Sequence, residues 1–366
     1  MSTRAFNFSA GPAVLPLEVL EATKQAVYDY NGSGMSVMEL SHRSKEFEPV
    51  IFEAQADCLK LMNLSPDEYA VLFLGGGASF QFYMIPFNFL NKKANYINTG
   101  VWATKAIKEA ETLCLGKVKV IASSKDKNFN YIPKEYTVDA DADYLHITTN
   151  NTIYGTTWAK DPEGVKVPLI ADMSSDIFAT RRDFSKYDLI YGGAQKNIGP
   201  SGATFVVIKK SFLEKCQRKD VKFPSMMDYK IHIENESMFN TPPCLPIYVI
   251  GQTFKWLLKN GLEKVEKDNI KKAGVLYDYM DNSGGFYTPT VTVKEDRSLM
   301  NVPFLIKGGN PDLEAKFLTE AKPKRMYNLK GHKSVGGLRA SIYNACPLEW
   351  IEELTKFMDE FKQANS

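Results

Sequence analysis

YDLIYGGAQKNIGPSG, residues 187–202, joins an apolar run to a turn rich in glycine and proline. The apolar run is typical of a buried β-strand, and the glycines and proline indicate that the strand ends there. Lys196 stands in this turn between Gln195 and Asn197, away from the charged helix faces where lysines usually lie. A lysine held in a tight turn at a strand end indicates a specific task for its amine.

Similar apolar runs recur through the first 210 residues, and helical patterns such as 101–113 lie between several of them. The runs are YAVLFL (69–74), VKVIAS (118–123), DYLHITT (143–149), VPLIADM (167–173) and ATFVVIK (203–209). Strands that alternate with helices predict an α/β fold with a mainly parallel sheet buried on both faces. In such sheets ligands bind at the carboxyl ends of the strands, which is where Lys196 lies.

The sequence pattern changes after about residue 260. Residues 262–282 predict one long amphipathic helix, followed by short strands at 300–306 and 337–344 and a closing helix near 348–363. We therefore expect a large domain over 16–262 and a smaller α+β domain over 263–366, to which we also assign the N-terminal segment 1–15.

Composition limits the possible functions. The 366 residues are 44% hydrophobic and 24% charged, with a net charge of +2, so nothing favours a nucleic-acid surface. We expect no signal peptide and no membrane span, because no apolar run approaches the roughly 20 residues required. The cysteines are dispersed without C-x-x-C pairs, which predicts buried thiols, a cytoplasmic location and neither disulfides nor a metal site.

Four further features lie where apolar strands end. FLGGGASFQF (73–82) passes through three glycines into a helix and could cradle a phosphate. Asp172 ends a strand, Thr152 follows another, and Trp102 opens a helix. Three of the four have a structural alternative: the glycine turn as a plain connection, Asp172 as a helix cap or solvated acid, and Trp102 as core packing.

Together these features match the requirements of pyridoxal 5'-phosphate (PLP). A glycine turn can hold the phosphate, an aromatic ring can cover the planar cofactor, and an acid can pair with its ring nitrogen. A lysine in a turn can form an imine with the aldehyde. The sequence therefore predicts a PLP site centred on Lys196.

Six long segments, in order along the chain, resemble those of the phosphoserine aminotransferase family, class V aminotransferases of PLP fold type I. They are FNFSAGPAVLP (6–16), SVMELSHRSKEF (36–47), GAQKNIGPSG (193–202), SMFNTPP (237–243), DNSGGFY (281–287) and GHKSVGGLRASIYNA (331–345). The resemblance implies a mainly parallel, seven-stranded-type sheet in the large domain.

The resemblance also implies roles for individual residues at the cofactor. Lys196 would form the imine and shuttle the proton, Asp172 would keep the ring nitrogen protonated, and Trp102 would stack on the ring as the third catalytic residue. The remaining cofactor contacts would be Thr152 at the ring hydroxyl; Ala78, Ser79 and Gln195 at the phosphate; and Asn240 and Thr241 at the phosphate from the second subunit of a homodimer.

Substrate contacts follow from the same resemblance. Arg339 would pair with the α-carboxylate, for which its planar fork is suited. A pocket for the distal phosphate would consist of His42, Arg43, His332 and Lys333. Position 333 departs from the family, which commonly has arginine there; the charge is kept but the fork is lost.

The activity that the resemblance implies is transfer of the amino group of glutamate to 3-phosphohydroxypyruvate, which gives O-phosphoserine and 2-oxoglutarate in serine biosynthesis. Two alternatives within the fold are an alanine–glyoxylate type aminotransferase and a cysteine desulfurase, for which Cys346 would be the candidate thiol. An alternative of another class is a nucleotide-binding doubly wound protein, which leaves Lys196 and Asp172 unexplained.

Overall fold

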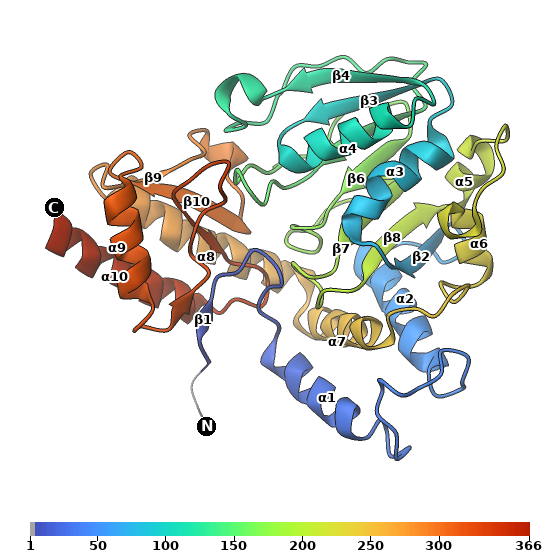
Figure 1. The fold of residues 1–366 in the computed structure, drawn as a ribbon, viewed down its shortest axis with the longest axis horizontal. Coiled ribbons are helices and arrows are strands. Elements are labelled where there is room, and N and C mark those ends of the chain that lie inside the picture. Colours follow the sequence, from blue (N-terminus) through green and yellow to red (C-terminus); the bar gives the residue numbers. More distant parts are fainter. Residues whose placement is uncertain (1–3) are drawn as a thin grey trace.

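The computed structural model describes residues 4–366 and contains two main β-sheets with separate hydrophobic cores (Figure 1). A seven-stranded sheet occupies the right of the view, and a three-stranded sheet backed by helices occupies the left. The predicted α/β class, with a mainly parallel large sheet, is confirmed.

The large sheet has the order β2-β8-β7-β6-β5-β3-β4. Its strands are β2 (Tyr69–Leu74), β3 (Lys93–Asn98), β4 (Lys117–Ser123), β5 (Tyr144–Thr148), β6 (Leu169–Asp172), β7 (Leu189–Gly193) and β8 (Thr204–Lys209). Strand β8 runs antiparallel to both of its neighbours, and the strands from β7 to β4 are mutually parallel. The carboxyl ends of β5, β6 and β7 therefore meet at one edge, which carries the turn with Lys196.

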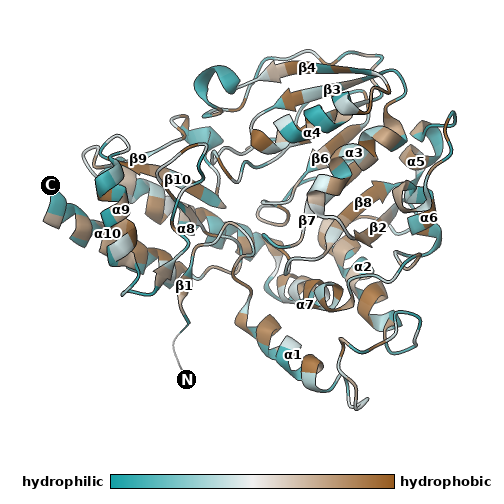
Figure 2. Ribbon diagram, in the orientation of Figure 1, coloured by the Kyte–Doolittle hydropathy of each residue, from teal (hydrophilic) through white to brown (hydrophobic). Residues whose placement is uncertain are grey.

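Helices cover both faces of this sheet, which explains why most of its strands are continuously apolar. In β8, Phe205 and Val207 belong to one core, whereas Val206 and Ile208 belong to the other. Figure 2 accordingly shows the inner strands in brown. Helices α2 (Glu48–Met62) and α7 (Cys244–Asn260) pack on one face of the large sheet, and α3 (Gly77–Phe89), α4 (Val101–Thr112), α5 (Lys210–Cys216) and α6 (Tyr229–Glu234) pack on the other.

Strand β3 was not among the predicted strands, because Lys93, Asn95 and Asn98 interrupt its apolar pattern. Asn95 is nevertheless fully buried: its amide nitrogen donates to the Asp139 carboxylate, and its side-chain oxygen accepts from the Asp139 backbone N–H. Asn95 makes the strand difficult to recognise in the sequence, but both polar atoms of its side chain are hydrogen-bonded to a residue 44 positions away.

The second core is built around β9 (Tyr287–Pro289), β10 (Asn301–Ile306) and β12 (Leu338–Ser341), in the order β12-β10-β9. The helices that pack on it are α8 (Leu262–Asp281), α9 (Pro311–Ala321) and α10 (Leu348–Asn365). Asn310 caps the start of α9, because its side chain accepts hydrogen bonds from the N–H groups of Asp312 and Leu313.

The N-terminal segment lies against this second core. Strand β1 (Phe6–Asn7) pairs in parallel with β11 (Met326–Tyr327), and Phe8 and Val14 are buried among the core residues. The chain then enters α1 (Leu17–Tyr28), which lies at the lower edge of Figure 1. The division into domains at 262/263, with segment 1–15 in the smaller one, stays a prediction, and residues 1–3 lie outside the described part.

Short 3-10 turns complete the elements and occur at Lys125–Lys127, Phe184–Lys186, Ser225–Met227 and Lys294–Asp296. None of the helices formed by the described residues combines the length and apolar character that a bilayer span requires.

The cysteines only partly follow the expectation of buried thiols. Cys58 and Cys346 are buried, but Cys114 is exposed, and Cys216 and Cys244 are half-buried. Cys114 is exposed because it lies in the turn that follows α4, where it adopts a positive φ of 52°. All five thiols are free.

Candidate active site

Lys196 extends from the turn after β7 and donates a hydrogen bond from Nζ to Thr152 Oγ1 at 2.8 Å. Thr152 itself is buried in the segment after β5. Burial of the amine lowers the pKa of Lys196 to about 8, against the opposing attraction of Asp172. A larger fraction of the amine is therefore neutral, and able to act as a nucleophile or base, than in an exposed lysine.

Asp172 ends β6 and is 4% exposed. Its Oδ1 accepts from the backbone N–H of Ser174 at 2.9 Å and from the Ser174 hydroxyl at 2.6 Å. Burial raises the pKa of Asp172, while the nearby Lys196 cation and the two Ser174 bonds oppose that rise. Within residues 4–366, Oδ2 has no hydrogen-bond partner, so one oxygen remains available to a ligand.

Trp102 lies in the first turn of α4, and the centroid of its ring is 5.2 Å from Lys196 Nζ. Its indole Nε1 is buried and has no partner among the described residues. Trp102, Lys196, Thr152 and Asp172 thus come together from four separate parts of the chain. This matches the predicted grouping of an aromatic face, an amine, a hydroxyl and a carboxylate.

The glycine turn between β2 and α3 supplies the features expected of a phosphate cradle. Gly76 and Gly77 have φ values of 86° and 68°, which open the backbone at the start of the helix. Ala78 and Ser79 lie in the first turn of α3, whose N-terminus has no side-chain cap. Open space lies beyond Gly77, so a phosphate could approach the free N–H groups there.

Cations lie close to Thr152 and Lys196 as well. Arg339 of β12 donates from Nη1 to the Thr152 carbonyl at 3.1 Å, while its buried Nε has no partner in the described chain. His332 and Lys333 lie in the loop before β12. Burial lowers the pKa of His332, and the cations of Arg339, Lys333 and Lys105 lower it further. These groups form a positively charged region next to the amine.

Four of the predicted site residues are not brought to this place. His42 and Arg43 lie in the loop between α1 and α2. Asn240 and Thr241 lie exposed in the loop before α7. In the described chain, no hydrogen bond, ion pair or ring contact joins any of the four to Lys196, Arg339 or His332.

The structure adds two residues that the predicted site lacked. The Ser174 hydroxyl accepts from the Gly193 N–H at 3.1 Å while donating to Asp172, so it ties the ends of β6 and β7 together. Gly11 packs on the lysine: a Cβ at that position would lie 3.3 Å from Lys196 Cγ and 3.3 Å from the Gln195 carbonyl. The D-x-S spacing at 172–174 is a local sequence signal for the contact between Ser174 and Asp172. No local signal exists for the packing of Gly11 on Lys196.

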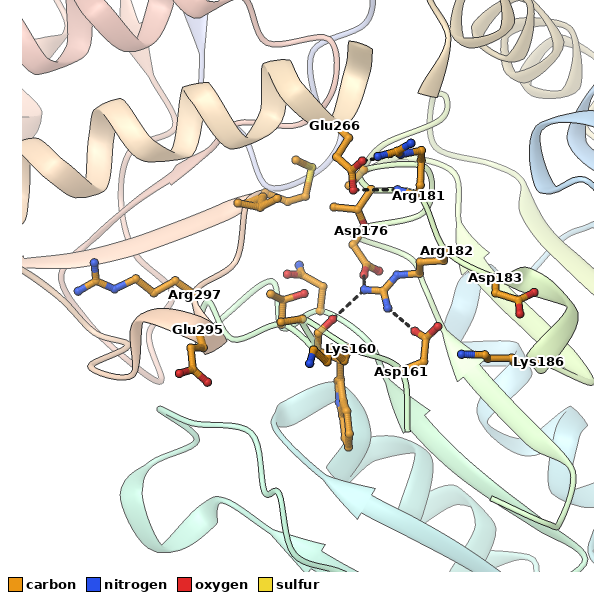
Figure 3. Close-up of a pocket in the computed structure, with 18 of the residues that line it drawn as sticks. Lys160, Asp161, Asp176, Arg181, Arg182, Asp183, Lys186, Glu266, Glu295 and Arg297 are labelled. Carbon is orange, nitrogen blue, oxygen red and sulfur yellow. Dashed lines mark hydrogen bonds and ion pairs between the residues drawn. The ribbon is translucent and has the colours of Figure 1, made fainter. Parts of the chain in front are cut away.

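A separate cavity of about 410 Å³ opens between the loop after β6, the loop after β5 and the segment before β10 (Figure 3). Arg182 lies at its wall and binds Asp161 at 2.6 Å and Asp176 at 3.1 Å. Asp176 also accepts from Thr149 Oγ1. The predicted site residues are absent from its described lining, so this cavity is not the site centred on Lys196.

The residues around Lys196 fit PLP in particular. The unpartnered Asp172 Oδ2 can accept from a protonated ring nitrogen, Trp102 can cover the ring, and the uncapped start of α3 can bind the phosphate. The amine, of lowered pKa, can reach an aldehyde carbon. Among the described residues, no group of three or more His, Cys, Asp or Glu side chains is arranged to hold a metal ion.

Comparison with known proteins agrees with this geometry. The family model "Aminotransferase class-V" matches residues 5–354. The chain is 54% identical to the phosphoserine aminotransferase of Phocaeicola vulgatus, over 98% of each sequence. The solved phosphoserine aminotransferase of Bacillus circulans subsp. alkalophilus superimposes with a TM-score of 0.94 at 46% identity, over the full length of both chains. The PLP-bound enzyme of Trichomonas vaginalis gives 0.91 at 37% identity, over 97% of this chain and 100% of that one.

These matches extend over nearly the whole chain, and their identities far exceed the level at which only a fold is shared. The chain therefore belongs to the class-V aminotransferases and, within them, to the phosphoserine aminotransferase family.

Proposed function

We propose that this chain is a PLP-dependent aminotransferase that moves the amino group of glutamate to 3-phosphohydroxypyruvate, giving O-phosphoserine and 2-oxoglutarate for serine biosynthesis. The observation that carries the proposal is the convergence of Lys196, Asp172, Trp102 and Arg339 beside cations without acidic partners. The family membership and the relatives' names support the same reaction.

PLP, when bound, supplies an aldehyde that accepts the amino group and a ring that withdraws electrons from the reacting carbon. Lys196 holds and moves the proton at Nζ. With a pKa near 8, it exchanges a proton at neutral pH more readily than an ordinary lysine does. Thr152 orients that amine through the 2.8 Å bond between its hydroxyl and Nζ.

Asp172 orients the cofactor ring and holds a negative charge opposite its nitrogen. Ser174 fixes the carboxylate through Oδ1, which leaves Oδ2 for the ring. Trp102 would cover one face of the ring and exclude water from it. Ala78, Ser79 and Gln195 bind the phosphate through the start of α3 and the turn after β7.

Substrate binding uses two groups of cations. Arg339 binds the α-carboxylate that both substrates share, and its unpartnered Nε is a free donor for it. His332 and Lys333 bind the distal anion, which is the side-chain carboxylate of glutamate in one half-reaction and the phosphate of the keto acid in the other. One pocket can serve both because each substrate ends in an anion.

We further propose that the enzyme is a homodimer whose sites are shared. His42, Arg43, Asn240 and Thr241 lie away from the site of their own chain, and they would complete the site of the second subunit. Exposed apolar side chains support such an interface: Tyr28 is 86% exposed, Met38 60% and Leu17 57%, all on α1 or the loop after it. A cytoplasmic location also stays a prediction, supported by the five free cysteines.

Two of the alternatives leave features of the site unexplained. A cysteine desulfurase needs a reactive thiol, but Cys346 is 3% exposed and burial raises its pKa to about 12. A nucleotide-binding protein has no use for a lysine amine beside a buried carboxylate. An alanine–glyoxylate type enzyme remains the rival to test, because its substrates lack the distal anion.

A substrate panel tests the proposal. The purified protein should be yellow, and its visible band should shift on addition of glutamate. Lys196→Ala should bind PLP without turnover. Among keto acids, kcat/KM should be higher for 3-phosphohydroxypyruvate than for hydroxypyruvate, pyruvate or glyoxylate. The panel should also include a phosphorylated substrate of vitamin B6 synthesis. Equal use of glyoxylate or pyruvate would overturn the assignment.

A further inference from the structure

Lys105 is an exposed residue of α4 that lies one turn after Trp102. Its Nζ lies 4.7 Å from the centroid of the Trp102 ring, and Lys196 Nζ lies 5.2 Å from the same centroid. The sum of the two distances, about 10 Å, is the largest separation that these two amines can have. Lys105 is therefore close to the reacting amine, although it belongs to none of the sequence motifs.

The direction of the Lys105 side chain is informative. Glu109 lies four residues further along α4, where an ion pair within the helix could form. No such pair occurs; the ammonium lies over Trp102, toward the N-terminal end of the helix and the site. Within residues 4–366, Lys105 has no hydrogen bond and no ion pair.

The start of α4, which carries Lys105, packs near the loop that contains His332, because Val101 and Trp102 of the helix and Val335 of the loop pack against one hydrophobic cluster. The charge of Lys105 acts on His332 together with those of Arg339 and Lys333, and all three lower the pKa of that imidazole. Arg339 and Lys333 likewise form no ion pair in the described chain. Several cations from α4 and from the segment around β12 thus lack an ion-pair partner among the described residues, an arrangement that an anionic ligand would stabilise.

We propose that Lys105 is a specificity-determining residue that binds the distal anion of the substrate together with His332 and Lys333. The inference rests on the proposed function, whose keto acid carries a phosphate three bonds from the reacting carbon. A cation less than about 10 Å from Lys196 Nζ, on a helix whose start packs near the loop of His332, lies within reach of that phosphate. Because position 333 has an ammonium instead of a guanidinium fork, a second ammonium adds a contact to the phosphate.

Three variants test the inference. Lys105→Met removes the charge but keeps an apolar chain over Trp102, Lys105→Arg keeps the charge, and Lys108→Met is the matched control. Lys108 is also exposed, lies on the same helix and has no side-chain contact to the site in the described chain. With 3-phosphohydroxypyruvate, Lys105→Met should lower kcat/KM about tenfold, mainly through KM, whereas Lys105→Arg and Lys108→Met should change it less than about twofold.

With unphosphorylated hydroxypyruvate, Lys105→Met should change kcat/KM less than about twofold, because the missing phosphate removes the contact. An equal loss with both keto acids would mean that Lys105 acts through the packing of Trp102, and no loss with either would mean that it does not contact the substrate. Either result overturns the inference.

A second measurement does not depend on turnover. In holoenzyme labelled at its four histidines, NMR titration should show a higher pKa for His332 in Lys105→Met than in wild type or Lys108→Met. An unchanged pKa would place Lys105 outside the cluster and overturn the inference. If the wild-type enzyme shows no preference for the phosphorylated keto acid, the proposed function fails and the inference with it. A wild-type preference that Lys105→Met leaves intact overturns the inference alone.

Discussion

The Lys196 amine is buried and lies near the Asp172 carboxylate, and these two features shift its pKa in opposite directions. Burial lowers its pKa to about 8, and Asp172 limits the fall. Since only the neutral amine attacks an aldehyde, the rate at which cofactor-free protein takes up PLP should rise about tenfold per pH unit below 8 and level off above it. Stopped-flow absorbance from pH 6 to 9.5 would measure the profile. A rate that still rises about tenfold per pH unit up to pH 9.5 would show an amine of ordinary basicity.

Asp172 provides the negative charge that keeps the cofactor ring protonated in our proposal. Asp172→Asn keeps the size and the acceptor toward Ser174 but removes that charge, so kcat should fall by about 100- to 1,000-fold while KM changes much less. Asp183→Asn, which alters an exposed carboxylate that caps a 3-10 turn, is the control. A nearly normal kcat in Asp172→Asn would reduce Asp172 to a structural acid.

Lys333 is the member of the phosphate pocket that departs from the family pattern. As a flexible point charge it should accept replacement by arginine with little change, whereas Lys333→Ala should lower kcat/KM for 3-phosphohydroxypyruvate by about 10- to 150-fold. Arg43→Ala should do the same. Kinetics with hydroxypyruvate provide the control, and a silent Lys333→Ala would mean that this enzyme does not use the position.

Strand β5 contains a buried histidine that should make the stability of the large sheet depend on pH. His146 is 2% exposed, and its Nε2 lies 2.8 Å from the Tyr191 hydroxyl of β7. Burial lowers the pKa of His146 to about 3. Because the folded pKa lies below the unfolded value of about 6.5, the unfolded state binds the proton first, and stability is lost as the pH falls from 6.5 toward 3.

His146→Gln should remove this dependence while a side-chain amide can still reach Tyr191. Between pH 7 and pH 5 the wild-type enzyme should lose about 2 kcal/mol more of its unfolding free energy than the variant does. Urea unfolding at both pH values would measure the difference. Parallel losses in the two proteins would show that His146 is protonated in the folded state.

Assembly determines whether each chain can complete its own site. Lys196→Ala and a His42→Ala/Arg43→Ala double variant should each be nearly inactive. If His42 and Arg43 serve the partner's site, a mixed dimer contains one intact site. Random exchange of equal amounts makes about half of the dimers mixed, so the mixture should recover about one quarter of wild-type activity. No recovery after verified subunit exchange would place all of these residues in a single chain's site.

Local patterns in the sequence determined the fold class and predicted where the centre of the candidate site would lie. Continuous apolar runs separated by helical patterns predicted the two-sided sheet, because strands covered on both faces need no polar alternation. Lys196, Asp172 and Thr152 were identifiable because each follows such a run, and parallel strands bring their carboxyl ends to one edge. The six family segments then added roles that no periodicity encodes.

Contacts between distant segments were decided only by the tertiary structure. Strand β3 was hidden because its Asn95 is satisfied by Asp139, and no local pattern records that bond. The packing of Gly11 on Lys196 and the contact of Arg339 with Thr152 both depend on how the two cores lie against each other. The separation of Arg43 from its own site is equally invisible in the sequence. Periodicity specifies which face of an element is buried, whereas sheet order and packing determine which side chains meet.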